Sequence, residues 1–164
     1  MPFELPDNLH PDCAPIAWLL GTWRGNGHGD YPTIDGFQFG QECIFTHDGR
    51  PFFHYMSRSW IVDEQGQKVR DAAIETGFFR CKADGALEVV LTHSTGFVEV
   101  WYGQAEPAKL EIQTDAVART TSAKEYAAGH RLYGLVEGDL LWAYDMAAMG
   151  QDLQPHIWGR LQRQ

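Results

Sequence analysis

The sequence predicts an all-β protein of about ten short strands that form a sandwich or a barrel. Turn signals recur roughly every 8–15 residues along most of the chain. The 164 residues include 17 glycines, and 13% of them are aromatic, a combination typical of short strands joined by tight turns. We expect one domain over residues 9–164, preceded by a tail over residues 1–8.

The first expected element is a short helix. Residues 11–20 end at Gly21, and glycine is common just after a helix, while Asp12 is placed to cap the start. Apolar residues on one face, including Ile16 and Leu19, predict that this helix covers something apolar.

Strands are expected from Gly21 onward. Residues 36–46 alternate between two faces, and the segment Lys82-Ala83-Asp84-Gly85 has the Asp-Gly signature of a hairpin. The other expected strands follow in order at 51–62, 71–81, 87–93, 97–103, 110–118, 130–135, 140–149 and 152–163.

Several of these strands are apolar on both faces, most clearly at 97–102 and 140–146. A barrel somewhat wider than the smallest can hold one ligand, so one of the apolar faces could border a bound molecule. The alternative is a well-filled core with some aromatic side chains on the surface. The pattern does not decide between these two interpretations.

The charge balance disfavours two classes of partner. The formal net charge is −9, from 13 Lys and Arg against 22 Asp and Glu. Binding to nucleic acid or to an anionic membrane surface depends on dense basic residues, so neither is expected. No run approaches the roughly 20 apolar residues of a membrane span, and the first residues lack the basic start of a secretory signal.

The three cysteines are Cys13, Cys43 and Cys81. Their odd number and wide spacing argue against a disulfide framework and fit a reducing compartment, so we expect a cytoplasmic protein. We interpret them as core or surface residues rather than nucleophiles.

Common catalytic motifs do not occur in the sequence. The seven histidines include no His-x-x-x-His pair, and there is no Cys-x-x-Cys, so a structural or hydrolytic zinc site has no support. There is no Gly-x-Ser-x-Gly elbow. The glycine-rich segment 25–29 precedes a strand rather than a helix, so its glycines indicate close backbone approach or bending rather than phosphate binding.

His156 lies in the last expected strand. By simple alternation it shares a face with Trp158 and Arg160, opposite Ile157 and Leu161. A mixed face of this kind is more typical of an exposed surface. If the barrel holds a ligand, however, this face would point inward and the Ile157 and Leu161 face would pack outside.

At Gly21, Trp23, Gly25 and Gly27 the sequence matches the pattern Gly-x-Trp-x-Gly-x-Gly. The pattern resembles the motif of the nitrobindins, small haem-binding β-barrels related in shape to fatty-acid-binding proteins. Further segments resemble this family in the same order across residues 9–164, at 9–21, 31–34, 96–100, 123–125, 146–151 and 156.

The resemblance implies a ten-stranded antiparallel up-and-down barrel that holds one haem b at its mouth. His156 matches the axial iron ligand, Thr33 matches a residue that contacts the haem, and Lys124 matches a position near a propionate. Imidazole suits iron, and a single protein ligand leaves the sixth position open. Trp158 would pack beside the haem or fix the imidazole, and a hydrogen-bond acceptor is expected at the other ring nitrogen.

Pro155 departs from the family pattern. It lacks a backbone N–H, so it predicts an edge-like or bulged position for the strand that carries His156. His54 and His93 are candidate donors on the other side of the haem.

By resemblance, the leading hypothesis is a monomer or homodimer that binds nitric oxide and isomerises peroxynitrite to nitrate on ferric haem, with His156 as the catalytic ligand. The charge of −9 provides no long-range attraction for the peroxynitrite anion. One alternative is a carrier of a fatty acid or other apolar ligand, or a nitric oxide sensor, in the same barrel. Another is a barrel filled by its own side chains.

Overall fold

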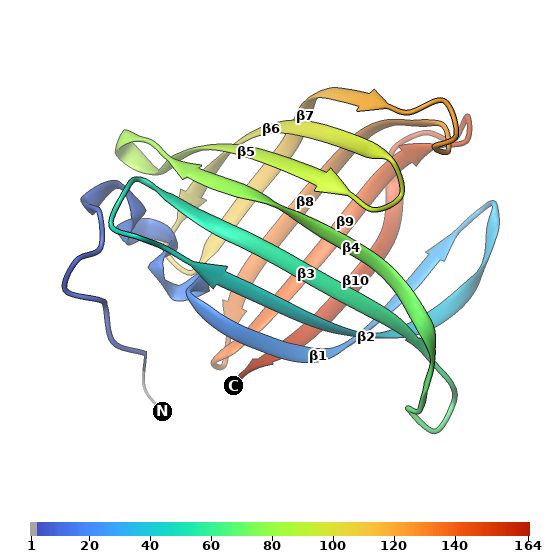
Figure 1. The fold of residues 1–164 in the computed structure, drawn as a ribbon, viewed down its shortest axis with the longest axis horizontal. Coiled ribbons are helices and arrows are strands. Elements are labelled where there is room, and N and C mark those ends of the chain that lie inside the picture. Colours follow the sequence, from blue (N-terminus) through green and yellow to red (C-terminus); the bar gives the residue numbers. More distant parts are fainter. Residues whose placement is uncertain (1–2) are drawn as a thin grey trace.

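Ten antiparallel strands close into a barrel in the computed structural model, which describes residues 3–164 (Figure 1). Each strand pairs with its neighbours in sequence, and β1 pairs with β10 to complete the closure. The strands are β1 (Gly21–Tyr31), β2 (Ile34–Thr46), β3 (Phe52–Val62), β4 (Lys68–Cys81), β5 (Ala86–His93), β6 (Phe97–Glu106), β7 (Lys109–Arg119), β8 (Tyr126–Val136), β9 (Asp139–Ala148) and β10 (Gln154–Arg163). The all-β prediction is confirmed, as a barrel.

Two short 3₁₀ helices accompany the strands, η1 (Pro11–Leu19) and η2 (Ala83–Gly85). The expected first helix is therefore present in 3₁₀ form, with Pro15 inside it. The residue that caps this helix differs from the prediction. His10, not Asp12, is the cap, and its Nδ1 accepts a hydrogen bond from the backbone N–H of Asp12 at 3.1 Å. Residues 1–2 of the expected tail lie outside the described residues. No helix within residues 3–164 is long and apolar enough to cross a membrane.

The two ends of the barrel differ. The η1 segment lies across one end, which we call the plug end (Figure 1). Trp23 fixes this segment, because its Nε1 donates to the Leu19 carbonyl at 2.8 Å. The Arg163 guanidinium lies 4.1 Å from the Trp23 ring centroid and binds the Trp18 carbonyl at 2.6 Å. The β1–β2, β3–β4, β5–β6, β7–β8 and β9–β10 turns gather at the opposite end, which we call the mouth.

The inward-facing side chains of β3 change along the strand. They are aromatic near the plug, at Phe53 and Tyr55, and small at Ser57 and Ser59, before Ile61 near the mouth. Phe79 on β4 packs against Tyr55 with ring centroids 5.4 Å apart. Aromatic rings therefore fill the half of the barrel near the plug, whereas serines leave space near the mouth.

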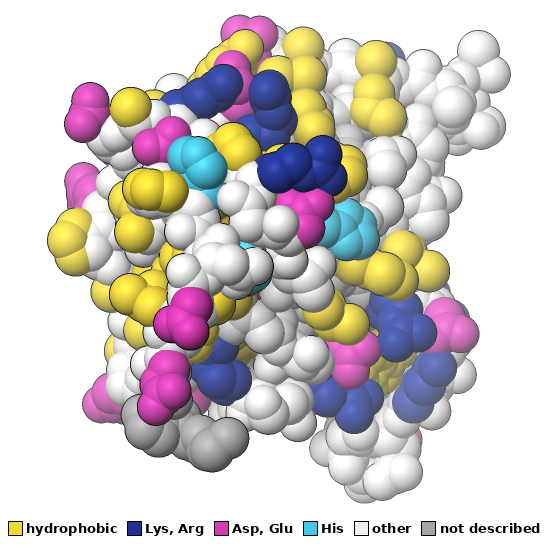
Figure 2. Space-filling model, turned by 60° about the vertical axis from the view of Figure 1, so that its left-hand side comes forward, with side chains coloured by type: hydrophobic (Ala, Val, Ile, Leu, Met, Phe, Trp, Pro, Cys, Tyr) yellow, Lys and Arg dark blue, Asp and Glu magenta, His cyan; other side chains and the backbone are white. Residues whose placement is uncertain are grey.

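The second apolar face of the strands lies on the outer surface. Val98 and Tyr102 of β6 are about half exposed, whereas Trp101 between them is fully buried. The outward apolar face of β6 is therefore outer surface with exposed aromatic and aliphatic side chains. On the face shown in Figure 2, hydrophobic, acidic and basic side chains are interspersed.

An ion pair crosses the barrel interior. Arg131 on β8 is 1% exposed, and its Nη1 lies 2.7 Å from Oε2 of Glu75 on β4. The guanidinium also lies 4.7 Å from the ring centroid of Tyr144 and 5.2 Å from that of Trp101. Burial alone would raise the pKa of Glu75, but the nearby Arg131 and His93 charges outweigh burial and hold it below its ordinary value.

The glycines of the Gly-x-Trp-x-Gly-x-Gly motif allow β1 to approach its surroundings closely. A Cβ atom on Gly25 would lie 2.1 Å from the Arg160 carbonyl oxygen of β10, and one on Gly27 would lie 2.3 Å from the Phe39 ring. The interpretation of these glycines as sites of close approach is confirmed. Together with Trp23, Gly25 and Gly27 build the barrel wall and the plug rather than the mouth.

We expect Gly25→Ala to destabilise the fold by about 1–3 kcal/mol, because the added methyl group must displace backbone atoms. Gly36→Ala is the matched control, since its Cβ would lie 3.5 Å from the nearest atom, an ordinary contact. Urea unfolding of both variants measures the difference. Equal free energies of unfolding would contradict the close-approach interpretation.

We expect Glu75→Gln to reduce stability at neutral pH by about 3–5 kcal/mol, because Arg131 loses its buried partner. The folded pKa of Glu75 is lowered, so its contribution is fully present above the unfolded pKa of about 4.3 and is lost as pH falls through the folded value. The deficit of the variant should therefore shrink on acidification below about pH 4.

Denaturant unfolding measured over a pH series tests this expectation. Glu64→Gln, in the exposed β3–β4 turn, is the control that should follow the wild type. A Glu75→Gln deficit that stays constant with pH would refute the role of the ion pair.

Candidate functional site

A cavity of about 550 Å³ opens at the mouth of the barrel. Its wall comes from β2, β3, β4, β9 and β10 together with the β5–β6 turn, and includes the apolar side chains of Phe39, Ile61 and Ala73. The volume lies within the range of about 300–1,000 Å³ that is usual for small-molecule sites. Among the residues that line it there is one imidazole, that of His156.

A β-bulge places His156 in this cavity. Pro155 lies opposite Asp145 of β9 and Ile157 lies opposite Tyr144, so His156 is an extra residue between the two pairs. The extra residue interrupts the alternation of faces, and His156 and Ile157 both line the cavity. The bulge expected from Pro155 is confirmed. The predicted alternation is wrong, because His156 faces inward whereas Trp158 and Arg160 face outward.

The backbone of β1 holds one nitrogen of the imidazole. The His156 Nδ1–H donates to the Asp30 carbonyl oxygen at 3.0 Å. The β1–β2 pairing shifts register between Gly29 and Tyr31, so Asp30 lies opposite two residues of β2 and has no regular partner there. This bond identifies the expected acceptor and leaves Nε2 as the ring nitrogen available to the cavity.

Three aromatic rings surround the imidazole. The rings of Tyr31, Tyr144 and Phe37 lie 5.4, 5.8 and 6.5 Å from it between centroids, all in edge-on orientations. Tyr31 is itself fixed, because its hydroxyl donates to the Met146 carbonyl at 2.9 Å and accepts from the backbone N–H of β9 at 3.0 Å. The ring of His156 therefore has little freedom to rotate away.

His156 is 8% exposed, and burial lowers the pKa of its imidazole. The hydrogen bond to Asp30 opposes this effect, whereas the positive charges of Lys124 and Arg131 reinforce it. A lowered pKa favours the neutral ring, which is the form that binds a metal.

Gln41 provides polar atoms on the cavity wall. Its Oε1 accepts from Trp142 Nε1 at 2.9 Å, and its Nε2 donates to Ser57 Oγ at 2.9 Å. These bonds satisfy the amide and fix the Trp142 ring against the cavity.

Thr33 and Lys124 both lie at the mouth. Thr33 is exposed in the β1–β2 turn, next to Ile34 of the cavity wall. Lys124 follows the β7–β8 turn, and its Nζ lies 3.4 Å from Met146 Sδ. Lys124 is exposed to solvent and does not line the cavity. Partial burial lowers the pKa of its ammonium group, and its positive charge lowers the pKa of His156.

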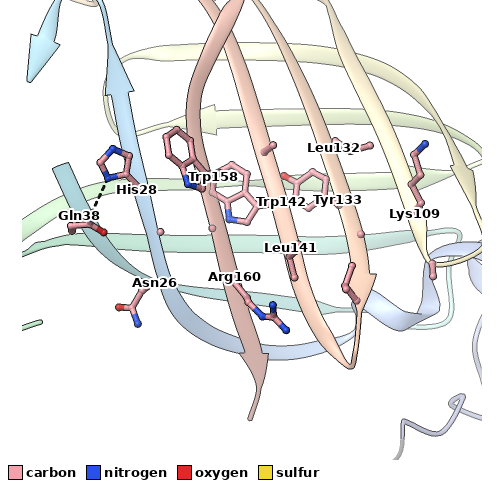
Figure 3. A pocket seen from close by; sticks show the side chains of 16 residues that line it. Asn26, His28, Gln38, Lys109, Leu132, Tyr133, Leu141, Trp142, Trp158 and Arg160 are labelled. Carbon is pink, nitrogen blue, oxygen red and sulfur yellow. Dashed lines mark hydrogen bonds between the residues drawn. The ribbon is translucent and has the colours of Figure 1, made fainter. Parts of the chain in front are cut away.

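Trp158 lies outside the barrel, which corrects the expectation that it faces inward to pack beside the haem or fix the imidazole. Its ring is 46% exposed and lies 4.7 Å from that of His28, whose Nδ1 lies 2.9 Å from Gln38 Nε2 (Figure 3). These side chains border a hollow of about 760 Å³ on the outer surface of the sheet. His156 does not line this hollow, but Trp142 lines both the hollow and the His156 cavity.

The other two candidate histidines differ in position. His54 lies on the outer face, where its Nε2 lies 3.0 Å from Thr76 Oγ1. His93 is buried; its Nε2 contacts Glu99, and its ring stacks on Phe97 at 4.1 Å. His93 is thus already engaged by a carboxylate inside the barrel.

Several residues of this region were not found from the sequence. The role of Asp30 is that of a backbone carbonyl, which carries no residue-type signal. Glu75 and Arg131 can be recognised from the sequence pattern. By alternation Glu75 shares a face of β4 with the buried Phe79, and Arg131 shares a face of β8 with the buried Tyr133. A charged residue on such a face indicates a partner across the interior.

Comparison with known proteins assigns the fold to a family. The family model described as "THAP4-like, heme-binding beta-barrel domain" matches residues 12–163. A peroxynitrite isomerase of Nocardioides sp. is 73% identical over 164 residues, covering 100% of both chains. A peroxynitrite isomerase of Salinispora arenicola is 48% identical over 94% of this chain and 82% of its own length. A ferric nitrobindin-like protein of Streptomyces griseus is 42% identical over 98% of this chain and 85% of its own length.

A solved structure agrees with these matches. The crystal structure of Rv2717c from M. tuberculosis has a TM-score of 0.86 and 32% sequence identity to this chain, and covers 95% of this chain and 99% of that one. The barrel, the match over nearly all of the sequence and the relatives therefore lead to one conclusion: this chain belongs to the THAP4-like haem-binding β-barrel domains, the nitrobindin family.

Proposed function

We propose that this chain binds haem b through His156 and isomerises peroxynitrite to nitrate. The names of its relatives support the reaction, since two of the proteins that it matches over most or all of their length are peroxynitrite isomerases. The observation that carries the proposal is a buried neutral imidazole whose Nδ1 is bound to the Asp30 carbonyl and whose Nε2 remains for a ligand in the cavity.

The residues at the mouth fit a haem. The cavity is mainly apolar, as a porphyrin requires, and one imidazole is the usual protein ligand for an iron with an open position. The hydroxyl of Tyr144, beside His156, is buried and has no hydrogen-bond partner among the described residues. The Tyr144 hydroxyl, a polar group near the proposed iron ligand, therefore still needs a hydrogen-bond partner.

Each residue of the site has a separate role in this proposal. His156 holds the cofactor, and the Asp30 carbonyl fixes its tautomer and increases the basicity of Nε2. Lys124, with its ammonium group at the mouth, would hold a propionate of the haem, and Thr33 in the β1–β2 turn would contact the haem. The motif residues Trp23 and Gly25 act at the barrel wall and not on the ligand.

When bound, ferric haem supplies a Lewis acid with an open coordination position for the peroxynitrite anion. The chain's own residues exclude water from the cavity and hold the imidazole in place. Phe39 and Ile61 keep water from the cavity walls, and the rings around His156 prevent the imidazole from swinging out. The net charge of −9 gives no electrostatic steering, so the anion arrives by unassisted diffusion.

A bound haem would also offer this position to nitric oxide, which is uncharged and unaffected by the acidic surface.

We place the protein in the cytoplasm, a reducing compartment that is consistent with three free cysteines.

We expect His156→Ala to abolish most of the Soret-band shift that follows addition of hemin to the protein, because the iron loses its protein ligand. An absorbance titration measures the change, with His28→Ala as the control. His28 is also an imidazole on a neighbouring strand, but it lies on the outer surface. Wild-type hemin binding by His156→Ala would exclude the ligand assignment and favour a carrier of apolar molecules.

Hemin-loaded wild type should accelerate the decay of peroxynitrite and yield nitrate in place of nitrite, followed by stopped-flow absorbance and ion chromatography. Hemin-loaded His28→Ala should match it, whereas His156→Ala should approach the rate of the hemin-free protein. A loaded wild type that binds nitric oxide yet leaves peroxynitrite decay unchanged would reject the isomerase activity and retain a nitric oxide sensor.

A further inference from the structure

Two cysteines that are far apart in the sequence meet at the plug end. The sulfur atoms of Cys13 and Cys81 are 2.8 Å apart, although 68 positions separate the two residues. A disulfide bond is about 2.05 Å long, so the two thiols need to move by less than 1 Å to be joined. Both are free thiols and both are buried, at 0% and 3% exposure.

The pair connects two elements that backbone pairing leaves separate. Cys13 lies in η1, which belongs to no sheet, and Cys81 is the last residue of β4. Backbone bonds hold Cys81 in place, since its N–H donates to the Pro51 carbonyl at 2.8 Å. The thiol contact is therefore a direct link between the plug and the barrel wall.

The two sulfur atoms are chemically unequal. The hydrogen bond with the Cys81 thiol lowers the pKa of Cys13, although burial and Asp12 oppose it, and the same bond raises the pKa of Cys81. Cys43, the third cysteine, has no cysteine neighbour, and burial raises the pKa of its thiol to about 12. Because the thiolate is the reactive form, Cys13 is the favoured nucleophile of the three.

We propose that Cys13 and Cys81 form a two-electron oxidation site that reduces hydroperoxides and closes into a disulfide. The Cys13 thiolate attacks one oxygen of the hydroperoxide, so an S–O bond forms, the O–O bond breaks and, after protonation, water leaves when the oxidant is hydrogen peroxide. Cys81 then attacks the sulfenic sulfur of Cys13, so the S–S bond forms, the S–O bond breaks and a second water leaves. The peroxide gains the two electrons that the two thiols lose.

The disulfide would fasten η1 to β4 across the plug end. It would close a long loop of chain, and such a cross-link stabilises the fold mainly by restricting the unfolded state. The mouth and His156 lie at the other end of the barrel, so haem binding should not change. This site is thus independent of the proposed isomerase reaction.

The full chain, with and without hemin, is incubated with hydrogen peroxide and then denatured for thiol titration. We expect the number of free thiols to fall from three to one and the intact mass to fall by two hydrogen atoms. Peptide mapping should find Cys13 joined to Cys81, with Cys43 still free. Dithiothreitol should restore all three thiols, and the oxidised protein should melt on the order of 10 °C higher.

Cys43→Ala is the matched control and should show the same disulfide and the same rise in Tm. Cys13→Ala and Cys81→Ala should show neither, with far-ultraviolet circular dichroism to confirm that they fold. Three free thiols after prolonged exposure would overturn the proposal. So would a linkage through Cys43, a disulfide between two chains, or sulfinic acid at Cys13 with Cys81 unmodified.

Discussion

The hydrogen bond from His156 Nδ1 to the Asp30 carbonyl is the contact on which the site depends. It forms because the strand pairing is irregular at both residues: Asp30 lies where the β1–β2 register shifts, and His156 is the extra residue of a bulge in the β9–β10 pairing. The register shift takes Asp30 out of the regular pairing, and the bulge turns the imidazole inward beside Ile157. Without either of them the imidazole would lose its fixed tautomer or its access to the cavity.

The interior of the barrel has two parts: a packed half near the plug, which stabilises the fold, and a cavity near the mouth, which can bind a ligand. Aromatic rings such as Phe53 and Phe79 fill the half near the plug, and Trp23 ties that half to η1. Toward the mouth, serines of β3 and alanines of β4 form part of the wall, so space remains for a ligand. The Glu75–Arg131 pair lies within the interior, where each charge is tolerated because the other compensates it.

Much of the fold could be predicted because it follows from local pattern. Turn residues and the alternation of side chains gave the strand order, and Gly21 marked the end of the first helix. The alternation failed at His156 and Trp158 because a bulge adds one residue and reverses which neighbour faces inward. Pro155 contained the information needed to expect that bulge, but it did not indicate which way the next side chain would turn.

The sequence by itself determined the all-β class, the strands and the resemblance to a haem-binding family, since these follow from residue types and spacing along the chain. The choice of His156 came from that resemblance, because its strand alone is typical of an exposed face. Only the tertiary structure decided that Asp30 would accept the imidazole hydrogen bond, that Trp158 would lie outside, and that Cys13 would meet Cys81. These contacts join residues that are distant in sequence, and barrel closure and strand register, rather than local propensity, bring such residues together.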